Sequence, residues 1–282
     1  MNRHRIYKSI FQLLCVVGLF LLPTTEALAQ VSVKVGRRLP DVETWIKTTF
    51  ARGKVPPFSF IYDGQPSASF IKTWRYESTS NRTDNPDVVS YTFTYTQPTD
   101  RLRVRCEVKG YVSFGSIDWV LYVENNGRTN SKPLRALQAI DLGLRYGKSG
   151  QFVMNYVEGS QITKDDFQPR QLILPAGKPM VMSPEGGRSS QGKYTPFFCI
   201  TSPQGGGVML SIGWTGNWQA SVCAQSGNEV SLKAGQKRFD LYLHPSEQIR
   251  TPRVNIMFWE GADYLAGTNQ FRRLVLAHNS RC

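Results

Sequence analysis

The chain has 282 residues and a formal net charge of +13, from 34 lysines and arginines against 21 aspartates and glutamates. The basic residues stand singly or in pairs such as Arg37-Arg38 and Arg272-Arg273, with no longer run. Nucleic-acid binding needs a clustered basic face, so this distribution favours a solvated basic surface and no nucleic-acid partner. Attraction to acidic polysaccharide or to an anionic cell envelope stays open.

Residues 1–29 have the organisation of a signal peptide. A basic start is followed by an apolar run from Ile10 to Leu22 and by the A-x-A site Ala27-Leu28-Ala29, so cleavage would leave Gln30 first. The run is short for a membrane span, although a retained signal anchor is the alternative. No second apolar span follows. We therefore expect a secreted or periplasmic protein with no membrane span after signal cleavage.

Residues 30–56 are expected to form a lead-in. Asp41 can cap a short helix that ends at Phe50, with Trp45 and Ile46 on its apolar side. Pro56-Pro57 interrupts regular structure, and a β region follows.

From Pro57 onward, apolar and polar residues alternate with a period of two. The clearest case is Leu102 to Val108, where apolar side chains alternate with arginines and a glutamate. Similar short strands are predicted at Val89–Tyr95, Ile117–Val123, Leu137–Leu144, Phe152–Val157, Phe197–Thr201, Val208–Gly213, Trp218–Cys223, Val230–Leu232, Phe239–Leu243 and Val254–Trp259. Many short strands separated by turns predict an all-β sandwich or barrel. One helix is expected near the C-terminus, with Thr268 as its cap.

Four cysteines remain after signal cleavage, Cys106, Cys199, Cys223 and Cys282, and they allow three full pairings between which the sequence does not choose. Cys106 lies in a strand pattern and is expected to be a small buried residue. Without a C-x-x-C motif and with few histidines, the chain predicts no metal site and no cofactor.

No catalytic group is predicted. Retaining glycoside hydrolysis needs two carboxylates about 5 Å apart, and the adjacent Asp165-Asp166 is expected to diverge into water. The loop from Pro175 to Pro196 is the longest irregular segment, either functional or a plain connection.

The candidate carbohydrate-binding or interdomain residues are Trp214, Asn217, Trp218 and Arg188. Two tryptophans flank a glycine-containing turn, where indole rings could stack on sugar while Asn217 binds hydroxyl groups. Arg188 follows Gly186-Gly187 in a flexible, hydroxyl-rich segment. The alternatives are indoles packed in the core and a solvated loop.

Several segments resemble, in order, the N-terminal domain of glycoside hydrolase family 36-type α-galactosidases. They are Pro57–Gly64 with Phe70 and Trp74, Asp118–Gly127, Gln138–Asp141, Gly186–Ser190, Pro196–Phe198, Gly213–Trp218, Ile249–Arg253 and Asn269–Asn279. The resemblance implies a large antiparallel β-supersandwich with a short C-terminal helix over residues 57–282. In such enzymes a (β/α)₈ barrel follows and carries both catalytic aspartates.

Such a barrel needs at least about 200 residues, and only 282 − 279 = 3 residues follow Asn279. The resemblance therefore implies the front domain of a secreted α-galactosidase-like enzyme, inactive without a barrel supplied in cis or in trans. A free-standing module that binds carbohydrate, such as a galactoside, is the alternative. A structural remnant and a mutarotase-like enzyme using His244 are two further hypotheses.

Overall fold

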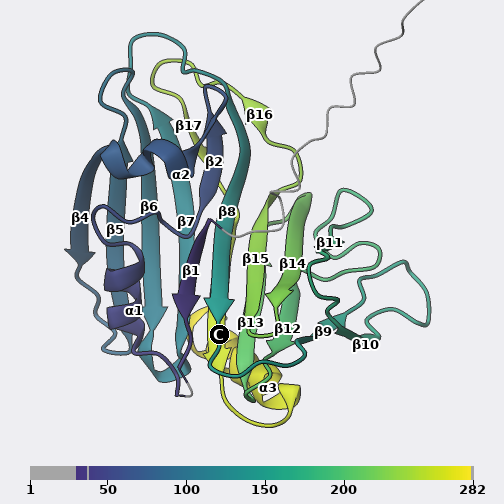
Figure 1. Cartoon of the computed structure of the whole chain (residues 1–282). Helices are drawn as coiled ribbons and strands as arrows, with labels where there is room; N and C mark the ends of the chain where they lie inside the picture. The colour runs from purple at the N-terminus through teal and green to yellow at the C-terminus, as the bar shows by residue number, and fades with distance from the viewer. Residues whose placement is uncertain (1–29, 37, 281–282) are drawn as a thin grey trace, which may run out of the picture.

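The structure is a computed structural model that describes residues 30–36 and 38–280. Two mainly antiparallel sheets pack face to face, and a helix lies at the C-terminal end of the chain (Figure 1). The predicted all-β sandwich with a C-terminal helix is thus confirmed. The predicted signal peptide and Cys282 lie outside the described residues. No helix in the described part is long and apolar enough to cross a membrane.

The two sheets have eight and ten strands and are called the smaller and the larger sheet. The smaller sheet has the order β11 (Met180–Met182), β14 (Trp218–Ser226), β15 (Glu229–Gln236), β8 (Leu134–Arg145), β2 (Ser59–Tyr62) and β3 (Gln65–Pro66), with β1 (Val31–Lys34) and β16 (Asp240–Leu241) also paired to β8. The larger sheet has the order β10 (Pro169–Ile173), β9 (Val153–Val157), β12 (Phe197–Thr201), β13 (Gly207–Gly213), β18 (Arg253–Trp259), β7 (Ser116–Asn125), β6 (Leu102–Tyr111), β5 (Val88–Thr96) and β4 (Arg75–Asn81), with β17 (Gln248–Arg250) also paired to β7. The helical elements are α1 (Val42–Thr49), α2 (Ser67–Phe70), η1 (Ile71–Thr73), η2 (Val112–Phe114) and α3 (Tyr264–His278).

The core lies between the sheets, and the period-two pattern decides which side chains enter it. On β6, Leu102, Val104 and Cys106 are fully buried, as predicted for Cys106. Trp119 of β7 reaches across the core, where its Nε1 donates a hydrogen bond of 2.7 Å to the carbonyl oxygen of Ala139 on β8. This bond joins the two sheets directly.

The Ile249–Arg253 segment interrupts pairing along one edge of β7. β17 and β18 pair with opposite ends of β7, and Thr251-Pro252 lies between them. Thr251 Oγ1 accepts from the amide of Leu121 at 3.0 Å, and the Thr251 amide donates to the Leu121 carbonyl at 2.9 Å. Because proline has no N–H, the chain can bend here without leaving an unpaired donor.

Residues 30–56 complete the same core. β1 pairs with β8, and α1 begins after Asp41, whose carboxylate accepts from the Thr44 amide as predicted for the cap. Phe50, just after α1, stacks on Phe93 with ring centroids 4.9 Å apart.

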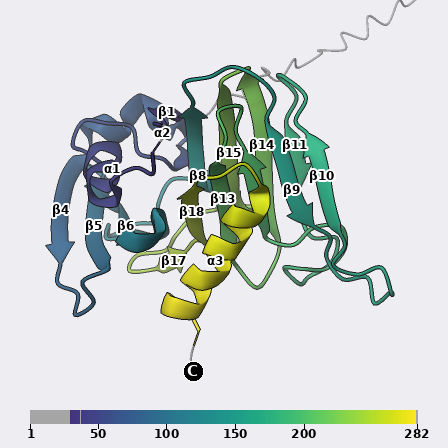
Figure 2. The ribbon, with the colours of Figure 1, turned by 90° about the horizontal axis from the view of Figure 1, so that it is seen from below.

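The C-terminal helix begins earlier than predicted. Asp263 caps it by accepting from the Leu265 amide, and Thr268 lies inside the helix, where its hydroxyl donates to the Tyr264 carbonyl. Thr268 is therefore not the cap. The helix crosses the outer face of the larger sheet over β12, β13 and β18 and buries Leu274 against it (Figure 2).

Candidate functional site

A groove of about 390 Å³ opens beside the Gly213–Trp218 turn. It is lined by Ser160, Gln161, Ile162, Phe167, Arg188, Ser189, Ser190, Gln191 and Thr215. Its volume lies within the range of small-molecule sites, and its lining combines two apolar side chains with hydroxyl, amide and guanidinium groups. This composition suits a polar ligand with an apolar face.

Asp166 organises one wall of the groove. Its carboxylate accepts from the hydroxyl of Ser160 at 2.5 Å and from the amides of Gln161 and Ile162 at 2.8 and 3.1 Å. The Ser160 bond, together with hydrogen bonds from Gln161 and Thr163, lowers the pKa of Asp166 to about 2. Asp166 is therefore committed to the loop, and Asp165-Asp166 does not form a catalytic pair.

The loop held by Asp166 presents apolar side chains to solvent. Ile162 is 93% exposed and Phe167 is 56% exposed. Both have a positive φ, 65° and 61°. Left-handed backbone at non-glycine residues is strained and is concentrated at functional sites. Phe167 is the aromatic residue among those that line the groove, and its exposed ring is open to a ligand.

Trp218 supports another part of the groove lining, the Gly186–Ser190 segment, from within the core. Its side chain is 0% exposed, packed edge-on against Phe198. Its Nε1 donates to the carbonyl oxygen of Ser189 at 2.7 Å. The ring offers no face to a ligand in this conformation, and it holds the Gly186–Ser190 loop against β14.

The other three candidate residues lie around the same turn. Arg188 is exposed and lines the groove. Asn217 is also exposed, but it lines a separate hollow of about 330 Å³ with Lys237 and others. Trp214 is half-buried, and the Arg250 guanidinium lies 5.9 Å from its ring centroid. Ligand binding at these positions stays a prediction.

The carboxylates on the outer face of β7 are engaged in ion pairs. Asp118 accepts from Arg253 Nη1 at 2.6 Å and from the hydroxyl of Tyr111 at 2.9 Å. Glu124 pairs with Arg103 and Arg105. Their positions differ by 124 − 118 = 6, about 20 Å along a strand, which is too far for the paired carboxylates of a glycosidase.

Of the two histidines in the described part, His244 does not meet a carboxylate through its ring. Its Nδ1 lies 2.9 Å from Asn130 Oδ1, while Glu247 accepts from its backbone amide. His278 on α3 does, with its Nε2 3.0 Å from Asp87 Oδ2, but its side chain is only 9% exposed. A proton-transfer pair in an open groove, as a mutarotase-like reaction requires, is therefore not formed by these two residues.

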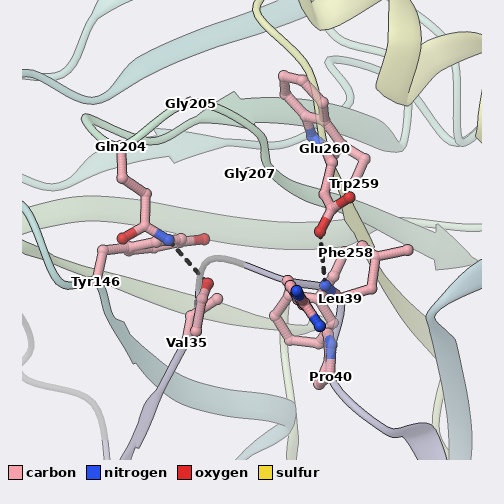
Figure 3. Close-up of a pocket in the computed structure, with 12 residues that line it drawn as sticks. Val35, Leu39, Pro40, Tyr146, Gln204, Gly205, Gly207, Phe258, Trp259 and Glu260 are labelled. Carbon is pink, nitrogen blue, oxygen red and sulfur yellow. Dashed lines mark hydrogen bonds between the residues drawn. The ribbon is translucent and has the colours of Figure 1, made fainter.

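A second cavity, more enclosed than the groove, is too small for a sugar. It lies where the chain around Val35 and Leu39 crosses Gln204 and Glu260 (Figure 3). Gln204 donates to the Gly36 carbonyl and Glu260 accepts from the Leu39 amide, each at 2.8 Å. Its volume is about 20 Å³, room for about one water molecule. These contacts tie the segment after β1 to the segments before β13 and after β18.

The described part of the chain has no cluster of metal-ligating side chains and no disulfide-bonded cysteine. No three His, Cys, Asp or Glu side chains there are grouped to hold a metal ion. Cys106, Cys199 and Cys223 are buried free thiols. Burial raises the pKa of Cys199 to about 12, which keeps this thiol protonated and unreactive at neutral pH.

The Asp166 loop is expected to resist acid until its carboxylate is protonated. Because the pKa is lowered in the folded state, the loop contacts are present above pH 3.8 and are lost as the pH falls toward about 2. An acid protease should cut beside Phe167 in Asp166→Asn about tenfold faster than in the wild type near pH 4, and this ratio should fall toward one as the pH drops through about 2. A wild-type loop cut equally fast at both pH values would contradict this role.

Comparison with solved structures finds the same fold as part of larger enzymes. The α-galactosidase from Lactobacillus brevis matches with a TM-score of 0.58 at 14% identity, over 79% of this chain and 31% of that one. The galactosidase domain of the α-galactosidase–sucrose kinase AgaSK matches with a TM-score of 0.57 at 13% identity, over 81% and 34%. A variant of the GH36 α-galactosidase AgaA from Geobacillus stearothermophilus, in complex with raffinose, gives 0.53 at 12% identity, over 74% and 30%.

The chain thus spans about a third of the length of these enzymes, and the match is a partial, N-terminal-type domain match. At these identities the similarity establishes the fold, which is the β-domain that the sequence motifs predict. No family model matches the sequence. No curated protein matches it either.

Proposed function

We propose that this chain is an exported β-domain of an α-galactosidase-like glycoside hydrolase, which works with a (β/α)₈ catalytic barrel in cis or in trans and does not hydrolyse glycosides alone. The observation that carries the proposal is the fold match, which covers 79% to 81% of this chain but 31% to 34% of the two matched chains. The ion-paired state of Asp118 and Glu124 supports the absence of chemistry in the domain itself.

The groove favours a second role, that of a carbohydrate-binding module for galactosides. The exposed Phe167 ring can stack on the apolar face of a sugar, while Arg188, Ser190 and Thr215 supply polar groups. Arg188 comes from the candidate set, whereas Trp218 acts by positioning the neighbouring Ser189.

Calorimetry with raffinose at millimolar concentration tests the groove. We expect Arg188→Ala and Phe167→Ala each to weaken binding about tenfold, a loss of about 1.4 kcal/mol. Arg238→Ala is the matched control, because Arg238 lines the separate hollow beside Asn217 and not this groove. No heat from the wild type, or equal losses for all three variants, would exclude galactoside binding in this groove.

Activity is measured separately. Purified protein should not turn over an aryl α-galactoside alone. If the wild type turns over the substrate well above background and Asp118→Asn abolishes this turnover, the domain itself is catalytic. That result would overturn the first proposal.

A further inference from the structure

Gln30 is anchored by its whole side chain. Its Nε2 donates to the carbonyl oxygens of Pro56 and Phe58, and its Oε1 accepts from the Ser67 hydroxyl at 2.9 Å. Ser67 Oγ in turn accepts from the Phe60 amide at 3.2 Å. The carboxamide therefore links the approach to β2 with the start of α2.

The backbone nitrogen of Gln30 meets a buried carboxylate. It donates to Asp141 Oδ1 at 2.7 Å, and the Ser59 hydroxyl donates to Asp141 Oδ2 at 2.7 Å. The Asp141 side chain is 6% exposed. Among the described residues its one ion-pair contact is Lys233, whose Nζ is 3.8 Å away, near the limit for a salt bridge. A buried carboxylate without a close cation is costly.

The position of Asp141 follows from the pairing of β8. One edge of β8 pairs with β2 up to Gln138 and with β1 from Leu142 onward. Asp141 falls in the interval between the two strands, and Gln30 fills the junction.

We propose that this junction is a docking site for a new N-terminus, created by hydrolysis of the Ala29–Gln30 peptide bond. One water is consumed; Ala29 leaves with the carboxylate, and the Gln30 amine takes a proton to become an ammonium. That ammonium forms a buried ion pair with Asp141, at the position where the Gln30 backbone nitrogen now donates. The inference rests on the predicted signal peptide and is independent of the proposed glycosidase and carbohydrate-binding roles.

The anchored side chain also protects the new terminus from cyclisation. An N-terminal glutamine can close to pyroglutamate when its amine nitrogen attacks Cδ and Nε2 leaves as ammonia. That reaction would remove the positive charge that Asp141 receives. In the fold, Nε2 and Oε1 are held by Pro56, Phe58 and Ser67, so these bonds must break before the ring can form.

The first experiment identifies the terminus and its chemistry. The full chain is exported from a bacterial host, and its first residue is determined by sequencing and intact mass. We expect a free amine on Gln30, with ammonia loss on storage at least about tenfold slower in native than in urea-unfolded protein. Ser67→Ala should speed this loss, whereas Ser69→Ala, at an exposed position of the same helix, should not. A different first residue, or equal rates in the native and unfolded protein, would overturn the proposal.

The second experiment tests the ion pair. A chain with one extra alanine before Gln30, released from a cleavable fusion, keeps every side chain but moves the amine away. We expect its Tm at pH 7 to be about 4 °C lower than that of the mature chain. The paired amine has a raised pKa, so the difference is complete below about pH 8 and vanishes as the pH rises through the folded pKa.

Lys233 faces Asp141 in the mature chain and in the alanine-extended chain alike, so its contribution to stability cancels when their Tm values are compared. In an Asp141→Asn background the added alanine should have no effect. Asp240→Asn, an exposed aspartate beside the other end of β8, is the matched control and should keep the full difference. If Asp141→Asn does not fold, the comparison of the mature chain with the alanine-extended chain, both with Asp141, still tests the proposal. Equal Tm values for these two chains would contradict the ion pair.

Discussion

Trp119→Ala is expected to lower the free energy of unfolding by about 4 kcal/mol. The indole is 0% exposed and packs edge-on against Phe50 with ring centroids 5.9 Å apart. Truncation would leave a cavity in the middle of the sandwich. It would also leave the Ala139 carbonyl without the donor that joins β7 to β8. Urea unfolding followed by circular dichroism measures the effect.

Two further variants separate packing from hydrogen bonding at Trp119. Trp119→Phe keeps most of the ring and loses the bond to Ala139, so a loss of about 1 to 3 kcal/mol is expected. Val112→Ala, at a 48% exposed position, should change stability by less than about 0.5 kcal/mol. A Trp119→Ala protein as stable as Val112→Ala would contradict the role of this residue as the link between the sheets.

Gly207→Ala is expected to destabilise the protein by about 3 kcal/mol or more. A Cβ at Gly207, the first residue of β13, would lie 1.9 Å from the carbonyl oxygen of Ile200 on β12. The obstacle is backbone, so no side-chain rotation can relieve it. The strands must separate, and we expect a large fall in the urea midpoint.

Gly213→Ala is the matched control, because Gly213 ends the same strand. Its Cβ would lie 3.4 Å from the Arg253 carbonyl, an ordinary contact. The change should cost less than about 1 kcal/mol. Equal destabilisation by both variants would mean that loss of glycine itself, and not the close approach of β12, sets the stability.

Local patterns were sufficient to predict elements whose signal lies within a few residues. The Asp41 cap identified α1, and strict alternation identified β6. β4 was not predicted, because its sequence from Arg75 to Asn81 is mostly polar and exposed. It forms a strand because it pairs with β5 at the edge of the larger sheet. The structure starts α3 at Tyr264 after the cap Asp263, whereas the sequence predicted Thr268 as the cap. Threonine and aspartate are both favoured at a helix N-cap, so the sequence pattern alone did not locate the start.

The candidate site was only partly visible in the sequence. Arg188 and the Gly213–Trp218 turn do lie at one groove. Trp218 is a candidate for stacking on a sugar from its place beside a turn, with packing in the core as the alternative. The register of β14 directs it into the core with Ala220 and Val222. Phe167 was not predicted as a site residue, because it lies in a polar loop without a strand or turn motif. Only the folded chain brings it and Arg188 to the same groove.

By itself the sequence determined the all-β class and the faces of its strands, because alternation and turn residues act over short distances. It also placed a glutamine directly after an A-x-A site. Only the tertiary structure decided which carboxylates form ion pairs and which of the tryptophans near the Gly213–Trp218 turn is fully buried. It alone brought Gln30 to Asp141, residues 141 − 30 = 111 positions apart, because such contacts depend on strand order and register, which no local pattern specifies.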